Sequence, residues 1–283
     1  MVLNRELVGK HYPPQEYGVT AEAIINYARA CNEDPSHFSA DYPNGMIAPP
    51  MFGVVAAWFS LMTVVTDSNL RVDVLRLLHS EQDMYFFHPL APGDIVTSRA
   101  NIAAIDNESG GESLTIEVNC INQRNEQVQR MLFTAFIRTP GARGKVRTRT
   151  PDARQSQAPL VQVRQRIDAD QTYRYAQASG DHNPIHVDEN VAKLAGLPGI
   201  IVHGLCTMAF AARVIVDHFC DGNSRRLSRL YARFARPVFP GQEISTTVWP
   251  WEDTKSTKVY AYATYNPDGK EVIKDGIAEI TTT

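Results

Sequence analysis

The sequence predicts an α+β protein made of two similar halves, in which each half is an antiparallel sheet wrapped on one long central helix. Residues 50–65 (PMFGVVAAWFSLMTVV) are apolar on all sides, as expected of a buried helix. Residues 113–121 (SLTIEVNCI) alternate apolar and polar side chains, as a half-buried strand does. The same order of features returns at a spacing of 144–149 residues. We therefore expect two cores that pair edge to edge as an internal pseudo-dimer.

The elements of the first half can be assigned in order. Residues 5–20 are mixed in character and interrupted by proline, which indicates an irregular edge strand. Residues 21–30 predict a helix with Thr20 as its N-cap, and a loop rich in Pro, Asp and Asn then runs to Pro50. The apolar helix follows, and about four strands complete the half, the last of them within residues 131–139.

The second half repeats the first closely enough to set domain boundaries. The matching segments are Tyr27-Ala28 with Tyr175-Ala176, FHPLAPGD (87–94) with ARPVFPGQ (235–242), and Asn122 and Val128 with Asn266 and Val272. Residues 140–159 are polar, basic and poor in apolar side chains, which favours a solvated linker over a phosphate-binding segment. The predicted domains are therefore an N-terminal half at 1–139, a linker at 140–159 and a C-terminal half at 160–283.

Composition excludes several classes of function. The net charge of −3 is made of well-mixed signs, so neither a nucleic acid nor a membrane surface is an expected partner. The longest apolar run, at about 53–65, is too short to span a bilayer. The four cysteines lack metal-type spacing, the N-terminus lacks a secretory core and the C-terminus carries no recognisable address, so we expect a reduced, cytoplasmic protein.

Cofactor signatures are also missing from the sequence. It contains no GxGxxG, no GxxxxGK[ST] and no HExxH motif. We therefore expect chemistry that requires neither a metal ion nor a bound cofactor.

Residues 179–188 (SGDHNPIHVD) carry the strongest functional signal. They place a carboxylate (Asp181), an amide (Asn183) and an imidazole (His186) just after a predicted helix, and Pro184 stiffens the turn between them. Taken singly, such residues are more often turn formers or packing groups. Together, a carboxylate and an imidazole that face each other can hold one water, with one group accepting its proton while the other donates.

The corresponding segment of the first half, NEDPSH (32–37), lacks this arrangement. Glu33 and Asp34 precede His37 by four and three residues, whereas Asp181 precedes His186 by five. The asparagine before the proline is also absent. Because catalysis depends strictly on placement, we expect one functional site, in the second half.

A second constellation lies at residues 199–219. A short β-branched run ends at His203-Gly204, and a buried helix begins at about Leu205. The unpaired N–H groups of a helix N-terminus suit an oxyanion, and Gly204 allows a ligand carbonyl to approach the backbone. Gly204 could equally serve only a tight corner between strand and helix. For His203, a structural hydrogen bond is favoured over a catalytic role.

These motifs carry a resemblance to a known family. The segments GDHNPIHVD, HGLCTMAFAAR (203–213) and RFARPVFPGQ (233–242) closely resemble the MaoC-like or hydratase-2 family of (R)-specific enoyl-CoA hydratases. The two-half length resembles the double-hotdog members of that family, and the resemblance covers nearly the whole chain. It implies a double-hotdog fold, a catalytic second half, and a degenerate first half that shapes the acyl and CoA pocket. The peroxisomal C-terminal address of some members is absent.

The resemblance also implies roles for individual residues. Asp181 and His186 would activate water, Asn183 would support their geometry, and the Gly204 amide would polarise the thioester carbonyl. Which member of the pair acts as the base stays open. Residues expected to contact the substrate are His203, Leu205, Lys193 and Arg233, with Arg229 as a further basic candidate for the CoA phosphates. The aromatic residues Phe52, Trp58 and Phe59 could narrow an acyl tunnel, although filling the core is the favoured reading.

The expected reaction is reversible hydration of trans-2-enoyl-CoA to (R)-3-hydroxyacyl-CoA, with CoA as part of the substrate. An alternative is a 3-hydroxyacyl dehydratase that acts on acyl-carrier-protein thioesters. A hotdog thioesterase and a non-catalytic acyl-CoA-binding module are less favoured. Family analogy further suggests a homodimer. Acyl chain length, branching and the physiological direction of the reaction are not predicted.

Overall fold

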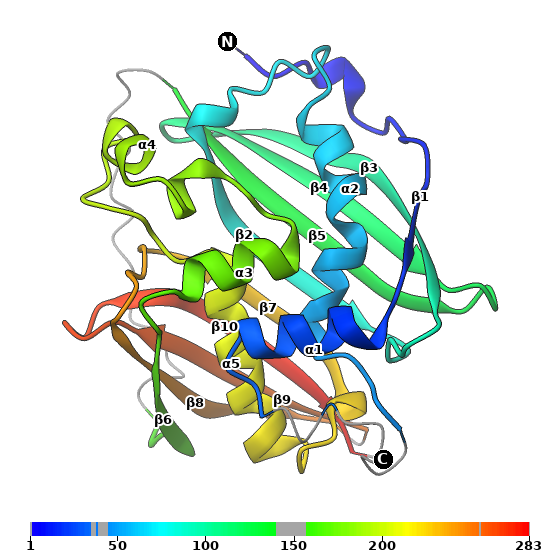
Figure 1. Ribbon diagram of the computed structural model, residues 1–283, viewed down its shortest axis with the longest axis vertical. Helices are drawn as coiled ribbons and strands as arrows, with labels where there is room; N and C mark the ends of the chain where they lie inside the picture. Colours follow the sequence, from blue (N-terminus) through cyan, green and yellow to red (C-terminus); the bar gives the residue numbers. More distant parts are fainter. Residues whose placement is uncertain (1, 35–37, 39–44, 140–156, 255, 283) are drawn as a thin grey trace.

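A computed structural model of the protein describes residues 2–34, 38, 45–139, 157–254 and 256–282. Its main element is a single antiparallel sheet of ten strands that curves around two long helices (Figure 1). In spatial order the strands are β1 (Gln15–Gly18), β3 (Ile95–Glu108), β4 (Gly111–Ile121), β5 (Gln127–Arg138), β2 (Leu77–Phe86), β7 (Leu227–Phe234), β10 (Glu271–Thr281), β9 (Thr257–Tyr265), β8 (Glu243–Asp253) and β6 (Val161–Arg166).

The strand order is symmetric about the centre of the sheet. β2 and β7 lie side by side there, and the strands of the two halves follow outward in corresponding order to the edge strands β1 and β6. The prediction that the two halves pair edge to edge is therefore confirmed, and this pairing makes their two sheets one continuous sheet. Pairing of Glu81 with Arg233 and of Tyr85 with Arg229 joins both halves into one sheet, because each half would otherwise expose unpaired backbone groups at that edge.

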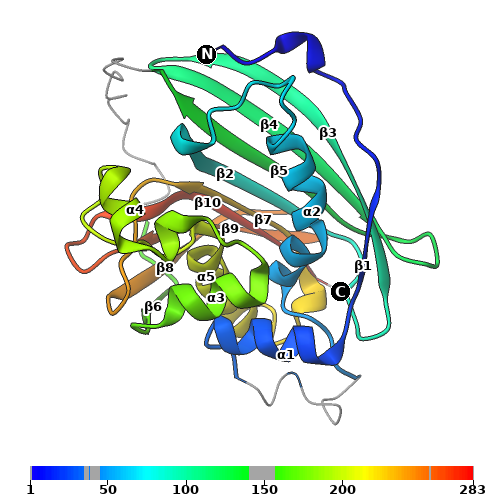
Figure 2. The same cartoon turned by 45° about the horizontal axis from the view of Figure 1, so that its top comes forward.

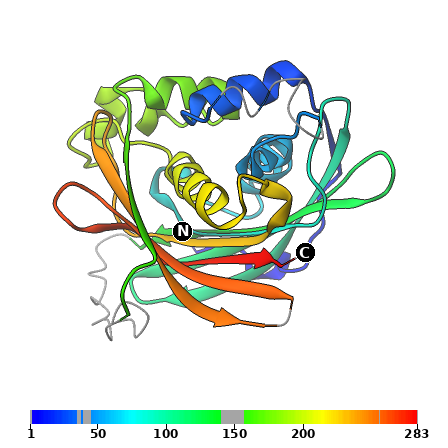
Figure 3. The same ribbon diagram turned by 90° about the horizontal axis from the view of Figure 1, so that it is seen from below.

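Two long helices, α2 (Gly53–Val65) and α5 (Gly204–Phe219), lie side by side in the concavity of the sheet (Figure 3). The helix predicted at 50–65 begins instead with a short 3₁₀ turn, η3 (Pro50–Phe52), before α2. α5 supplies most of its side chains to the core, including Met208, Ala211 and Ile215, which are fully buried. The central helices of both halves are therefore confirmed.

Two shorter helices, α1 (Ala21–Ala30) and α3 (Gln171–Ser179), pack against each other across the ends of α2 and α5. The predicted N-cap of α1 is confirmed, because the Thr20 hydroxyl accepts a hydrogen bond from the Ala23 N–H at 3.1 Å. The repeat Tyr27/Tyr175 becomes a contact between the halves, with ring centroids 5.7 Å apart and hydroxyl oxygens 3.5 Å apart. This contact therefore links α3, and the loop 179–188 that follows it, to a helix of the first half.

A fifth helix, α4 (Glu189–Leu194), was not predicted, and it lies with α3 on the same side of the sheet as the long helices (Figure 2). The sequence did contain its start signal. Asp188 caps it by accepting from the N–H groups of Asn190 and Val191. Short 3₁₀ turns occur at Arg5–Leu7 (η1), Val74–Arg76 (η4), Pro184–His186 (η6) and Ser224–Arg226 (η7).

The aromatic residues near α2 divide between core and surface. Phe52 is fully buried, as predicted, and Trp58 is partly buried. Phe59 is 64% exposed, so its assignment to the core was wrong. The sheet covers only one side of α2, and the face that carries Phe59 is left toward solvent.

Most of the predicted linker, residues 140–156, lies outside the described residues. So does His37, on which the comparison of the two halves partly rested. Within the part of the chain that is described, none of the helices is long and apolar enough to cross a membrane.

Candidate active site

The segment 179–188 folds into a tight loop between α3 and α4. Gly180 ends α3 with φ of +79°, a left-handed conformation that glycine adopts without steric cost. Asp181 follows at once, and its position is fixed by local hydrogen bonds. Its N–H donates to the Ser179 hydroxyl at 3.2 Å, and its carboxylate accepts from the Asn183 N–H at 3.1 Å. The prediction that Asp181 lies just past a helix end is confirmed.

Asn183 holds the turn that brings the imidazole back toward Asp181. Its side-chain oxygen accepts from the Ile185 N–H at 3.3 Å, and its main-chain oxygen accepts from the His186 N–H at 3.0 Å. These bonds cap and close the 3₁₀ turn η6, which Pro184 begins. The Asn183 side chain therefore shapes the loop through the backbone.

His186 is buried, and its ring is oriented by a backbone carbonyl. Nδ1 lies 2.8 Å from the main-chain oxygen of Ile201. Because a carbonyl oxygen can only accept, Nδ1 carries the proton in the neutral ring and Nε2 carries the lone pair. A ring nitrogen of His186, a carboxylate oxygen of Asp181 and a ring nitrogen of His203 all lie within 4.8 Å of one another. No sequence pattern predicts the contribution of Ile201, which lies 15 residues further along the chain.

His203 joins the pair from the start of α5. Its Nε2 lies 3.0 Å from the main-chain oxygen of Asp181, and its ring stacks on His186 with centroids 3.8 Å apart. The structural hydrogen bond favoured for His203 is therefore present. His203 as a whole is only 1% exposed.

Burial shifts the acid–base properties of this group. It raises the pKa of the Asp181 carboxyl, although His186, the Asn183 N–H and His182 favour the charged form. Burial lowers the pKa of His186, against the opposing effects of Asp181 and the Ile201 carbonyl. Both shifts favour the uncharged forms, so a protonated Asp181 and an unprotonated His186 can be present together more readily at one pH. A pair of this kind can move protons to and from a water held between them.

Gly204 begins α5 beside the pair. No side chain in the described part of the protein caps this helix start, so the N–H groups of the first turn remain available to a ligand oxygen. A Cβ at this position would lie 3.2 Å from the ring of Phe234, which is closer than ordinary contact. Glycine is therefore favoured here both by packing and by access to the helix terminus.

The three clustered side chains are also a conceivable metal-binding set, because one carboxylate and two imidazoles meet there. The two rings, however, are nearly parallel, with 28° between their planes. The in-plane lone pairs of stacked rings run side by side, whereas the ligands of a metal ion converge on one point. The geometry thus suits proton transfer better than coordination.

The other residues expected to contact substrate occupy three different environments. Leu205 is buried in the first turn of α5, and Lys193 pairs with Glu189 at 3.0 Å on the exposed surface of α4. Arg233 bridges Glu81 at 2.9 Å and Asp275 at 3.4 Å within the sheet. The predicted contact of Arg233 with CoA phosphates would require breaking both ion pairs, so we assign Arg233 to the join between the halves. Arg229, paired with Asp83 and Glu279, has the same role.

Trp58 is a neighbour of the site that only the tertiary structure identifies. Its indole lies 3.4 Å from where a Cβ of Gly180 would be, so a residue of the first half packs on the backbone next to Asp181. This contact places a side chain of the first half against the loop that carries Asp181.

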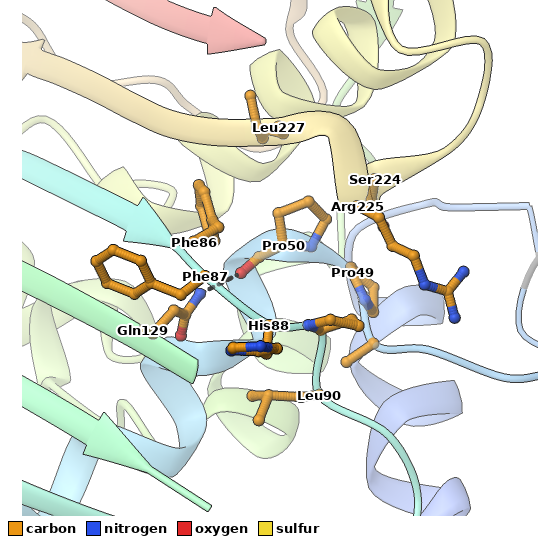
Figure 4. Close-up of a pocket in the computed structure, with 12 residues that line it drawn as sticks. Pro49, Pro50, Phe86, Phe87, His88, Leu90, Gln129, Ser224, Arg225 and Leu227 are labelled. Atoms are coloured by element: carbon orange, nitrogen blue, oxygen red, sulfur yellow. Dashed lines mark hydrogen bonds between the residues drawn. The ribbon is translucent and has the colours of Figure 1, made fainter. Parts of the chain in front are cut away.

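The first half has a different arrangement at the equivalent place. Glu33 corresponds to Asp181 at the spacing that relates Tyr27 to Tyr175, and burial raises its pKa to about 8. Gln129 fills the space beside Gly53 at the start of α2, where a Cβ would lie 1.4 Å from the amide oxygen. Its Nε2 donates to the Pro50 carbonyl at 2.9 Å (Figure 4). The Gln129 side chain therefore occupies the space beside this helix start, without a capping hydrogen bond to it.

Two family models match the chain in succession. Residues 6–131 match the FAS1-like, dehydratase domain region, and residues 150–270 match the MaoC like domain. A probable enoyl-CoA hydratase 2 of Dictyostelium discoideum is 27% identical over 98% of this chain and 96% of its own length. The 3-hydroxyacyl-thioester dehydratase Y of Mycobacterium tuberculosis is 31% identical over 72% of each chain.

The fold is shared with solved structures. A MaoC-like dehydratase from Phytophthora capsici superimposes with a TM-score of 0.82 at 21% identity, covering 99% of this chain and 98% of its own. The curved sheet around two central helices defines a double-hotdog protein, as predicted. With its motifs and its relatives, the chain belongs to the MaoC-like dehydratase and hydratase-2 family.

Proposed function

We propose that the protein catalyses reversible hydration of trans-2-enoyl-CoA to (R)-3-hydroxyacyl-CoA. One observation carries the proposal: Asp181 and His186 bring their titratable atoms within 4.8 Å, beside the uncapped start of α5 at Gly204. The names of the relatives, enoyl-CoA hydratase 2 and 3-hydroxyacyl-thioester dehydratase, support the same chemistry and a thioester substrate.

In this mechanism His186 is the base and Asp181 is the acid. The lone pair on His186 Nε2 takes a proton from water, and the water oxygen bonds to C3 of the enoyl group. The protonated Asp181 carboxyl gives its proton to C2. Transfer of the imidazolium proton to the Asp181 carboxylate then restores both groups, so the net change is addition of one water. Dehydration follows the same steps in reverse.

The helix start stabilises the charge that develops during addition. Electrons from the C2–C3 double bond move toward the thioester oxygen, and N–H groups near Gly204 receive that oxygen. Such stabilisation by one preorganised donor contributes about 3 kcal/mol in comparable sites. In the first half the Gln129 side chain occupies the corresponding space beside Gly53, which supports a single catalytic site per chain.

The direct test uses Asp181→Asn and His186→Ala with the loss of enoyl-thioester absorbance as the readout. Each variant is expected to lose about 10²–10⁴-fold in kcat, the contribution of a positioned acid or base. Asp268→Asn and His218→Ala change exposed residues of the same types and serve as matched controls. Near-full activity in folded Asp181→Asn and His186→Ala would sink the proposal. Chiral analysis of the product tests the (R) configuration.

A carrier-protein substrate is the second candidate, favoured by the match of residues 6–131 to a dehydratase region described as FAS1-like. Rates on crotonyl-CoA and on the same acyl group attached to acyl-carrier protein distinguish the two. A thiol reagent in the same assays reports hydrolysis. Release of free thiol without consumption of the enoyl group would favour a thioesterase instead.

The setting of the enzyme is also a proposal. We propose a homodimer in a reducing, cytoplasmic compartment. The four cysteines are all free and buried, which fits reducing conditions. Light scattering of the purified protein measures its assembly, and imaging of the tagged chain in its own cells measures its location.

A further inference from the structure

His203 contacts both members of the Asp181–His186 pair, in two different ways. Its Nε2 lies 3.0 Å from the main-chain oxygen of Asp181, so it donates a hydrogen bond that holds the loop backbone at the carboxylate. Its ring lies face to face with the His186 ring, with centroids 3.8 Å apart. Three residues from separate elements, the loop after α3, η6 and the start of α5, are thus connected through one side chain.

The position of His203 in the chain strengthens this connection. It is the residue immediately before Gly204, and its φ and ψ of −57° and 134° place it just outside the helix. A displacement of the ring would therefore move the helix start that receives the thioester oxygen. The acid, the base and the oxyanion site would share one anchor.

His203 is itself a poor candidate for proton transfer. In the neutral ring, donation from Nε2 leaves Nδ1 without a proton, and this buried Nδ1 has no hydrogen-bond partner among the described residues. Among the described residues no hydrogen-bond acceptor therefore stabilises a second proton on Nδ1. Burial, together with the nearby His186 and His182, lowers the pKa of His203 to about 2, although the hydrogen bond to the Asp181 carbonyl raises it. Tyr175 of α3 packs on the remaining side, with ring centroids 4.9 Å apart.

A neutral ring in this place affects how His186 meets water. The stacked face of His203 covers one face of the His186 imidazole, and desolvation is the main reason that the pKa of His186 is lowered. A charged neighbour would shift the pKa of His186 through its own charge. A neutral aromatic ring excludes water from the imidazole and adds no charge.

We propose that His203 is a positioning residue that fixes the Asp181 backbone with its Nε2–H and shields His186 with its ring face. The kinetic part of this inference rests on the proposed hydration, because it assigns His203 a role in that reaction. The structural part concerns His186 alone and can be measured without any substrate.

Three substitutions separate the two contacts. His203→Phe keeps an aromatic face for His186 and removes the donor to Asp181. His203→Gln keeps an amide donor and removes the ring face. His203→Ala removes both. His218→Gln, at the exposed end of the same helix, is the matched control.

The first measurement is the titration of His186 by NMR of labelled imidazole carbons in the free protein. In His203→Gln and His203→Ala, water reaches the exposed face, and the pKa of His186 is expected to rise by about one unit, a tenfold gain in proton affinity. In His203→Phe and His218→Gln it is expected to stay at the wild-type value. An identical titration in every variant, or an equal rise in His203→Phe, would overturn the shielding role.

The second measurement is the kinetics of enoyl-CoA hydration. His203→Phe and His203→Ala are expected to lower kcat by about 10–100-fold with little change in KM, because the carboxylate loses its backbone anchor. His203→Gln is expected to recover part of that loss. Wild-type kcat in His203→Phe would overturn the anchoring role. If wild-type protein itself fails to hydrate enoyl-CoA, the proposed function fails while the NMR result still decides the shielding.

Discussion

Arg229 of β7 forms a two-point ion pair with Asp83 of β2. Its Nε lies 2.9 Å from one carboxylate oxygen, and its second terminal nitrogen lies 2.8 Å from the other. The pair sits across the only strand contact that joins the two halves of the described sheet, and the same guanidinium also reaches Glu279 of β10. The guanidinium of Arg229 thus links β7 to β2 and β10 at the centre of the sheet.

Removal of this ion pair should lower the stability of the whole protein. Arg229→Met is expected to lower the free energy of unfolding by about 1–3 kcal/mol, because the pair is bidentate and mostly shielded from water. Arg164→Met is the control, since its contact with Glu243 is 3.8 Å long and exposed. Urea unfolding measures both. Equal, small losses of stability in both variants would show that the pairing of β2 with β7 depends on its backbone hydrogen bonds alone.

Stability should fall in mild acid because of His79. Burial lowers the pKa of this imidazole from 6.5 to about 3, and its ring packs 3.9 Å from that of Phe133, measured between centroids. Below pH 6.5 the unfolded chain binds a proton that the folded chain refuses until pH 3 is approached. Stability from this group is therefore complete above pH 6.5 and declines as the pH falls through that window.

The substitution His79→Gln isolates the effect, because glutamine stays uncharged. Unfolding free energies at pH 7.5 and 5.0 should differ by about 2 kcal/mol less in His79→Gln than in the wild type. His11→Gln, at an exposed position, should leave the difference unchanged. A wild-type difference retained in His79→Gln would assign the acid sensitivity to other groups.

Trp58 is expected to set substrate size. Its indole packs on Gly180, the residue before Asp181, so the reacting end of an acyl chain lies near it under the proposed function. Trp58→Ala should raise kcat/KM for C8–C12 enoyl-CoAs relative to crotonyl-CoA by roughly tenfold, the range that one pocket contact commands. Phe59→Ala, its 64% exposed neighbour, is the control. A ratio that shifts equally in both variants would show that Trp58 does not select the acyl chain.

The two helix starts should respond differently to the same substitution. Gly53→Ala places a methyl group against Gln129 and is expected to lower stability by about 1–3 kcal/mol without lowering kcat. The double variant Gly53→Ala/Gln129→Ala should recover part of that loss, since the clash is gone. Gly204→Ala should instead lower kcat/KM, because the methyl group displaces Phe234 beside the reacting oxygen. Additive stability losses at Gly53 and Gln129 would contradict their contact.

Much of the candidate site was predictable because it is local. Asp181, Asn183 and His186 lie in one turn after one helix, and hydrogen bonds between residues two or three apart give that turn its shape. The central helices were predictable for a similar reason, since an unbroken apolar run has to be buried. Repetition along the chain then indicated two halves without any knowledge of how they meet.

Only the tertiary structure could decide contacts between distant segments. Ile201 orients His186 and His203 holds Asp181 across 15 and 22 residues of sequence. Gln129 fills the space beside the Gly53 helix start from a strand, and Arg233 turns to carboxylates of two other strands. Such contacts depend on which faces pack together, a choice made by the total burial of the fold and not by the pattern of any one segment. The sequence by itself determined the reactive groups and their loop, whereas packing decided what surrounds, orients and shields them.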